Sequence, residues 1–188
     1  MANQFSRLQP EHRQFIDRQH VFFVASAAAR GRINLSPKGL NGLRILSDDA
    51  VAYLDLTGSG NETAAHVLAD GRLTFMFCAF EGAPMILRLY GRGQILHRGA
   101  RAYKTCLSDA FGNNEPPGAR QIVRLGIDLV LTSCGYGVPL LAHAGDRPSY
   151  GNWIRGKDES GLKAYQHEKN RVSIDGLPTG IEDGERTR

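Results

Sequence analysis

A short glycine-rich stretch has the chemistry of an anion-binding site. Thr57-Gly58-Ser59-Gly60-Asn61 leads into Asn61–Leu68, which has helical spacing. The glycines allow a positive φ or a close approach of the backbone to a ligand. Free N–H groups at the start of a helix, together with the helix dipole, favour a phosphate. Ser59, Asn61 and Thr63 add polar side chains, and Asn61 or Ser59 is also suited to capping the helix.

The composition of this loop is also that of an ordinary turn before a capped helix. Composition alone favours this structural interpretation over a binding site. The loop lacks the Gly-Lys-Ser/Thr of a Walker sequence, and it is not a GxGxxG fingerprint. Its candidate ligand-binding residues are Ser59, Gly60, Asn61 and Thr63.

Ser36-Pro37-Lys38-Gly39 forms a second candidate site. Proline stiffens the backbone beside Lys38, which would sit at a strand end and meet an anionic ring edge or a phosphate. A solvated turn lysine is the alternative, and it is favoured when this segment is considered alone.

Arg88 is the third candidate, because it interrupts the apolar stretch Met85–Tyr90. Alternation along a strand places Arg88 on one face with Ile86 and Tyr90. A part-buried arginine needs an anionic partner. A structural carboxylate and a bound ligand are equally consistent with this position.

Histidine and cysteine spacing predicts no metal site. The six histidines form no HxH or HExxH pattern. No two of the three cysteines form a CxxC pair; they are Cys78, Cys106 and Cys134. A disulfide framework is not expected either, and Cys134 is expected to be a buried small apolar residue.

Composition excludes several classes of protein. The net charge is only +4 and the basic residues form no run, which argues against a nucleic-acid partner. No apolar run approaches the roughly 18 residues of a membrane span, and Met1–Arg18 is too polar for a signal peptide. A cytoplasmic protein with no membrane partner is therefore expected.

The elements that must position these residues are mainly strands. Helices are expected at Pro10–Gln19, Asn61–Leu68, Ala100–Ala110 and Gly161–Lys169. Strands are expected at Val21–Ala28, Leu43–Leu46, Ala50–Leu56, Arg72–Phe80, Met85–Leu96 and Gln121–Ser133. Pro37 is expected to interrupt a short strand at Arg32–Ser36, and Gly91 and Gly93 to permit bulges.

This order predicts a mainly β protein with flanking helices. Short connections indicate antiparallel pairing, the chain lacks βαβα alternation, and small antiparallel sheets protect their edges by closing into barrels. We expect one domain over residues 1–188, with an N-terminal helix in 1–19, a barrel core in 20–134 and a helical or irregular tail in 146–188.

Five segments together resemble the FMN-binding split-barrel superfamily that includes pyridoxamine 5'-phosphate oxidase, in particular its oxidase-related subgroup. They are Ile33–Gly39, Tyr53–Ala65, Phe75–Phe80, Ile86–Gly91 and Ser173–Pro178. The resemblance implies a six-stranded antiparallel Greek-key split β-barrel. It also implies a homodimer with two FMN molecules at the subunit interface.

The resemblance further implies which residues contact the cofactor: Ser36, Pro37, Lys38, Ser59, Gly60, Asn61, Thr63 and Arg88. Glu62 and Thr63 stand where the oxidase carries a basic Arg-Lys pair. Phosphate contacts are therefore expected from backbone groups and neutral side chains, with help from Lys38 or Arg88. The oxidase's substrate-binding C-terminal segment is not recognisable, which predicts a different substrate.

The expected function is that of an FMN-dependent oxidoreductase acting on an unknown small-molecule redox substrate. The cofactor would supply the redox chemistry, and Lys38 near the N1–O2 edge of the flavin would stabilise its reduced anion. The alternative is non-catalytic binding or storage of a flavin, a deazaflavin or haem, because fold does not settle chemistry. An interaction module with a purely structural barrel is a third possibility.

Overall fold

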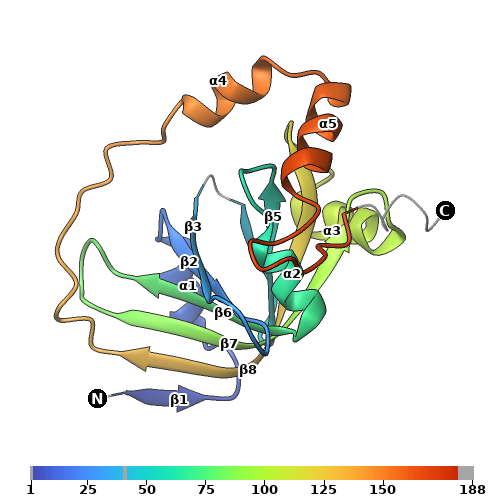
Figure 1. The fold of residues 1–188 in the computed structure, drawn as a ribbon. Coiled ribbons are helices and arrows are strands. Elements are labelled where there is room, and N and C mark those ends of the chain that lie inside the picture. Colours follow the sequence, from blue (N-terminus) through green and yellow to red (C-terminus); the bar gives the residue numbers. More distant parts are fainter. Residues whose placement is uncertain (1, 40–41, 182–188) are drawn as a thin grey trace.

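The computed structural model describes residues 2–39 and 42–181, which form one antiparallel sheet flanked by helices (Figure 1). The strands are β1 (Asn3–Phe5), β2 (Phe22–Ser26), β3 (Asn34–Lys38), β4 (Leu43–Ser47), β5 (Ala50–Leu56), β6 (Arg72–Cys78), β7 (Ile86–His97) and β8 (Ala119–Ser133). The helices are α1 (Pro10–Asp17), α2 (Glu62–Ala69), α3 (Arg101–Phe111), α4 (Ser149–Arg155) and α5 (Glu159–Lys169). None of the helices in these ranges is long and apolar enough to cross a membrane.

The strand order is β3-β2-β6-β7-β8-β5-β4, and β1 pairs with β8 beside this path. Every pair is antiparallel. The predicted mainly β class with flanking helices is confirmed. The hydrogen bonding does not show a six-stranded closed barrel. The sheet has eight strands, and within the described residues β3 and β4 are its two end strands and do not pair with each other.

Two long strands, β7 and β8, carry the curvature of the sheet. Their register shifts between Tyr90 and Gly91. At Gly91 an added Cβ would lie 1.9 Å from the carbonyl oxygen of Gly126, so only glycine fits. This agrees with the bulge expected here, and it lets the same two strands contribute to both apolar clusters of the protein.

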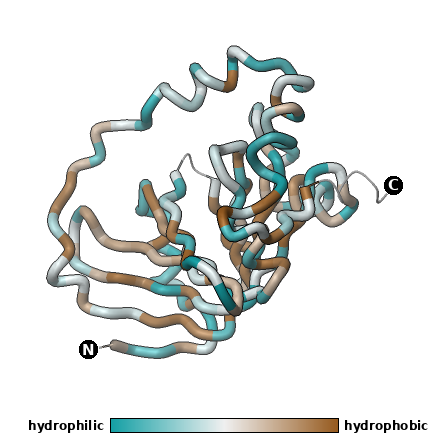
Figure 2. Tube along the Cα trace, viewed as in Figure 1, coloured by the Kyte–Doolittle hydropathy of each residue, from teal (hydrophilic) through white to brown (hydrophobic). Residues whose placement is uncertain are grey.

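The larger apolar cluster joins the inner face of the sheet to α1. Phe22, Phe75 and Phe77 meet there with Phe15 of α1. The second cluster lies under α3 and includes Tyr103, Leu96 and Ile122. Figure 2 shows these hydrophobic stretches running along the strands. Burying a large apolar side chain contributes about 1.5–3 kcal/mol, so these clusters fix the sheet on which the polar residues are placed.

Most predicted elements are confirmed, with shifts of a few residues at their ends. Pro37 does not interrupt a strand as expected. It lies within β3 opposite Phe23, and β3 tolerates the missing donor because it is an end strand of the sheet. Two elements were not predicted: β1, which has only three residues, and α4, which contains Gly151.

The chain after β8 leaves the sheet and then returns to it. Residues 134–148 contain no helix or strand and arc outward to α4 (Figure 1). From there α5 and the segment that follows it come back to the loop before α2. Hydrogen bonds from Gln166 and Asn170 hold this segment against the loop.

Candidate functional site

A pocket of about 440 Å³ lies between β3, which carries the predicted Ser36–Lys38 segment, and β5, which leads into the predicted glycine-rich loop. This volume lies within the range of roughly 300–1,000 Å³ that is usual for small-molecule sites. Phe22, Tyr53 and Phe111 supply aromatic walls. Pro37 and Lys38 line the pocket together with Gly58, the first glycine of the predicted loop. We call this space the ring pocket.

Lys38 reaches across the open edge of the sheet to a buried carboxylate. Its Nζ lies 3.1 Å from Oδ1 of Asp55 and 5.3 Å from the ring centre of Tyr53. The Nε of Arg120 lies 2.8 Å from the other oxygen of Asp55. Only 3% of the Asp55 side chain is exposed. Side chains therefore bridge β3 and β5, which are not paired by backbone hydrogen bonds.

Asp55 is held as an anion. Burial raises the pKa of its carboxyl, but the adjacent Arg120 and Lys38 outweigh this effect and bring the pKa to about 2. A buried carboxylate with two cationic partners is a stable internal counter-ion, so Asp55 is unsuited to donate a proton near neutral pH.

Two tyrosine hydroxyls of the ring pocket are buried and lack a well-formed hydrogen bond within the described residues. They belong to Tyr53 and Tyr150. Burial raises the pKa of Tyr53 well above 10, with Asp55 adding to the effect, although Thr63 lies close enough to lower that pKa slightly. Burial also raises the pKa of Tyr150. Both groups are therefore neutral donors. Unpaired buried donors beside flat apolar walls fit the polar edge of an aromatic ring system.

The predicted phosphate loop is tied into the interior of the protein. Asn61 is only 2% exposed, and its Oδ1 accepts a 2.7 Å hydrogen bond from Gln121. The carbonyl of Gly60 accepts a 2.8 Å bond from Arg120. Asn61 stands at the N-cap of α2, one of the two positions expected, but its side chain makes no cap hydrogen bond. Buried neighbours compete successfully for its amide.

Of the loop residues, Ser59 is the one with an exposed side chain. Thr63 is buried, and its Oγ1 accepts a 3.1 Å bond from Asn34 of β3. A phosphate near this loop thus finds Ser59 accessible and finds Asn61 and Thr63 already engaged. The residues present fit the ring of a flavin in the ring pocket better than they fit its phosphate at the side chains of Asn61 and Thr63.

A polar chain links β3 to a buried histidine on α2. Ser36 donates a 2.9 Å bond to Oδ1 of Asn34, whose amide also donates to Ser26 at 3.1 Å. The Ser26 hydroxyl lies 3.1 Å from Nδ1 of His66. Asn34 therefore holds both Ser36 and Thr63, two of the predicted cofactor contacts, in one network.

The C-terminal segment supplies partners that the sequence analysis did not identify. Asn170 has no exposed surface; its Oδ1 accepts a 2.9 Å bond from Arg120, and its amide donates to the carbonyl of Gly58 at 2.9 Å. Gln166 donates a 2.7 Å bond to the hydroxyl of Thr57. The segment therefore rests on the loop of its own chain, an arrangement that local sequence patterns do not reveal.

The Ser173–Pro178 motif lies beside the start of α2. Its Asp175 pairs with Arg32, and the backbone N–H of Ile174 donates a 3.0 Å bond to Glu62. Glu62 is therefore a hydrogen-bond partner of this motif.

Arg88 does not join the ring pocket. Leu87 and Leu89 beside it on β7 point into the core, so Arg88 points to the opposite face of the sheet. There its guanidinium donates a 3.2 Å bond to Ser133. Lys38, in contrast, lines the ring pocket. It lies directly opposite the core residue Phe22 in the β2–β3 register.

The expectation for Cys134 is wrong. Cys134 is exposed, contrary to the expected burial, because it follows the last residue of β8. Within residues 2–39 and 42–181 no group of three or more histidine, cysteine or acidic side chains is placed to hold a metal ion.

Fold and pocket together define the class: a mainly β protein whose antiparallel sheet carries a small-molecule-sized pocket with aromatic walls and a few polar groups. A model of the pyridoxamine 5'-phosphate oxidase family matches residues 8–134. The chain is 39% identical to a pyridoxamine 5'-phosphate oxidase family protein, ustO of Aspergillus flavus, over 93% of this chain and 76% of that protein. The chain belongs to the pyridoxamine 5'-phosphate oxidase family, and the resemblance is confirmed.

Solved structures agree on the fold. A variant of HupZ from group A Streptococcus aligns with a TM-score of 0.55 at 19% identity, covering 66% of this chain and 98% of that one. A pyridoxamine 5'-phosphate oxidase homologue of unassigned activity from Lactobacillus delbrueckii gives a TM-score of 0.52 at 18% identity, covering 67% and 94%. At these identities the similarity concerns the fold alone.

Proposed function

We propose that the protein is an FMN-binding flavoprotein whose isoalloxazine ring occupies the ring pocket between β3 and β5. The observation that carries this proposal is the combination of aromatic walls with Lys38 and the unpaired buried hydroxyls of Tyr53 and Tyr150. Family membership supports a flavin as the occupant.

Lys38 is the residue assigned to the electron-rich edge of the ring. An ammonium group has three N–H donors, and the contact with Asp55 engages one of them. In the described part of the chain the remaining donors have no hydrogen-bond partner, so in this proposal they face a ring oxygen or nitrogen. When bound, FMN supplies hydride or electron transfer, while the protein contributes position and electrostatics.

The phosphate is assigned to the exposed side of the loop at residues 58–60. Ser59 provides an accessible hydroxyl, and an added Cβ at Gly58 would meet no atom within 4 Å, so the backbone there is open to a ligand. In this proposal Asn61 and Thr63 position the loop from within through Gln121 and Asn34, respectively. Gly60 acts through its backbone.

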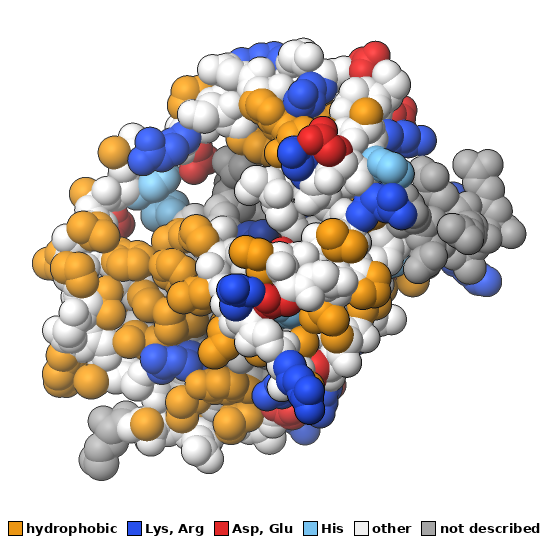
Figure 3. All heavy atoms as spheres, in the orientation of Figure 1, with side chains coloured by type: hydrophobic (Ala, Val, Ile, Leu, Met, Phe, Trp, Pro, Cys, Tyr) orange, Lys and Arg blue, Asp and Glu red, His pale blue; other side chains and the backbone are white. Residues whose placement is uncertain are grey.

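A homodimer would cover the outer face of the sheet. Phe23, Met76, Arg88 and Leu131 lie in one register across β2, β6, β7 and β8, and all are half-buried. Figure 3 shows hydrophobic side chains gathered over this part of the sheet. Such a face is suited to a second copy of the chain, and Arg88 would contact a flavin only across that interface.

The function we favour is an oxidoreductase acting on a small redox substrate distinct from pyridoxamine phosphate. Non-catalytic flavin storage is the second candidate. The observation in its favour is that Asp55 is held as an anion while Tyr53 and Tyr150 are held neutral, so these groups offer no acid or base near pH 7. Steady-state reduction of bound flavin by NADH or NADPH, followed by reoxidation, separates the two.

Titration of the flavin-free full chain with FMN and with riboflavin tests the assignment. Replacing Lys38 with Met should weaken both ligands at least about tenfold, since a hydrogen bond to a charged group contributes about 1.5–3 kcal/mol. Ser59→Ala should weaken FMN alone. The matched control is Lys169→Met, because Lys169 is half-exposed and pairs with Glu168. Unchanged affinity in Lys38→Met would mean that the ring lies elsewhere.

A further inference from the structure

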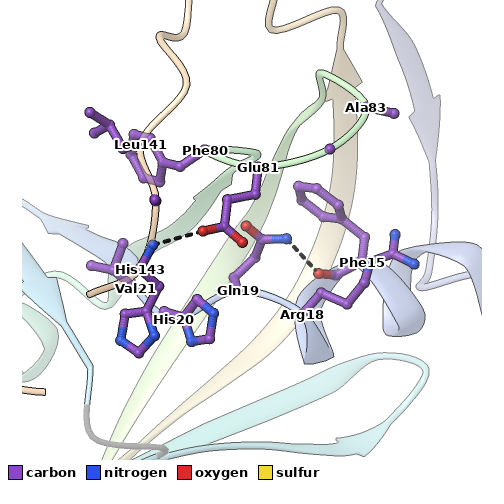
Figure 4. Close-up of a pocket in the computed structure, with 12 residues that line it drawn as sticks. Phe15, Arg18, Gln19, His20, Val21, Phe80, Glu81, Ala83, Leu141 and His143 are labelled. Carbon is purple, nitrogen blue, oxygen red and sulfur yellow. Dashed lines mark hydrogen bonds between the residues drawn. The ribbon is translucent and has the colours of Figure 1, made fainter. Parts of the chain in front are cut away.

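A second cavity, of about 710 Å³, lies at the C-terminal end of α1 (Figure 4). Its other walls are the turn between β6 and β7 and residues 141–143, which we call the strap. It shares no lining residue with the ring pocket.

The strap is fixed in place by three contacts. The backbone N–H of Leu141 donates a 2.9 Å bond to the carbonyl of Phe80. The backbone N–H of His143 donates a 2.7 Å bond to Oε1 of Glu81. The rings of His143 and His20 stack, with centroids 3.7 Å apart and planes 10° from parallel. A connection without helix or strand is thereby held as a wall.

The walls are apolar and partly uncovered. Phe15 and Phe80 enter from different sides of the cavity (Figure 4). Leu141 is 56% exposed although its backbone is anchored, so its side chain borders the cavity without full cover. An exposed leucine beside two phenylalanines is suited to a flat apolar molecule.

The polar side chains at the cavity differ in whether they already have a hydrogen-bond partner within the protein. Gln19 donates a 2.9 Å bond to the carbonyl of Phe15, and Glu81 accepts from the strap. Arg18 lines the cavity, is exposed, and has no side-chain partner among the described residues. Glu81 keeps its negative charge, but its carboxylate is oriented by the strap, whereas the donors of Arg18 remain available to a ligand. A planar guanidinium matches a carboxylate geometrically.

We propose that this cavity binds a planar aromatic carboxylate, with the ring between Phe15, Phe80 and Leu141 and the carboxylate at Arg18. The proposal is independent of flavin binding, since the two pockets have separate walls. We assign Glu81 to anchoring the strap and not to binding the ligand, because one of its oxygens already accepts the His143 N–H.

Three probes that share an indole ring test the charge assignment: indole-3-acetate, uncharged 3-methylindole and cationic tryptamine. Calorimetric titration of the full chain should give the order indole-3-acetate, then 3-methylindole, then tryptamine. Arg18→Gln should weaken indole-3-acetate about fivefold, the range of an exposed ion pair, and leave 3-methylindole unchanged. The control Arg13→Gln, in a residue of α1 that is paired with Asp48, should change neither.

A second variant tests the position of the site. Ala83→Trp fills the cavity and should abolish binding of both indole-3-acetate and 3-methylindole, with circular dichroism verifying the fold. Preferred binding of tryptamine, no binding of any probe at millimolar concentration, or full binding by a folded Ala83→Trp protein would overturn the proposal.

Discussion

Asp55 determines the electrostatics of the ring pocket at the scale of single residues. It lies between Lys38 and Arg120 and also accepts a 2.9 Å bond from Gln121. This carboxylate neutralises cations that would otherwise serve a ligand anion. The pocket is therefore less positive than a count of its basic residues suggests, because Asp55 engages part of the charge of Lys38.

Acid should destabilise the protein through this carboxylate. Its pKa of about 2 in the folded state lies below the ordinary value of 3.8. The resulting stability, about 2 kcal/mol, is fully present above about pH 5 and is lost as the pH falls through 4 towards 2. Denaturant unfolding of the wild type and of Asp55→Asn, measured between pH 6 and 2, isolates this contribution.

The wild type should lose more stability than Asp55→Asn over that pH window. The Asp48→Asn variant, which removes a solvent-exposed partner of Arg13, should follow the wild type closely because exposed ion pairs contribute little. Parallel pH profiles for the wild type and Asp55→Asn would show that Asp55 is not an ionised partner in the folded protein.

At the scale of elements, the sequence indicated strands and helices well and their long-range partners poorly. The alternation of apolar and polar residues indicated the core strands, and the glycines of β7 correctly predicted a bulge. Local patterns could not show that Arg120 and Asn170, far apart in the chain, would meet at the loop before α2. Asn61 illustrates this limit: it stands at the N-cap of α2 as expected, but its side chain bonds to Gln121 instead of to the helix.

The segment after α5 should depend on Asn170 for its position. Asn170→Ala removes bonds to Arg120 and to Gly58, leaving buried polar groups unpaired at a cost of about 1–3 kcal/mol. We expect faster proteolysis within residues 166–181, followed by mass spectrometry of the fragments. Asn152→Ala, which alters an exposed helix residue, is the control. Equal cleavage rates would contradict the proposed fastening.

At the scale of the whole molecule, the outer face of the sheet presents an apolar row with one cation. Sheet faces of soluble proteins rarely leave such a row uncovered. Met76→Lys places a second positive charge beside Arg88, its neighbour in the β6–β7 register, and should shift a dimer to monomer. Sedimentation velocity at micromolar concentration measures the change.

Leu140→Lys is the matched control for that experiment. Leu140 is 78% exposed and lies outside the sheet, so its replacement should leave the dimer intact. A Met76→Lys protein that is folded and still dimeric would place the interface elsewhere.

The central claim is that this chain holds FMN, and identification of the cofactor carried by the purified protein tests it most directly. Denaturation of a known amount of protein, followed by absorbance and mass measurement of the released small molecule, should give one FMN per chain. Colourless protein that also fails to take up added FMN, or release of a different cofactor, would contradict the account.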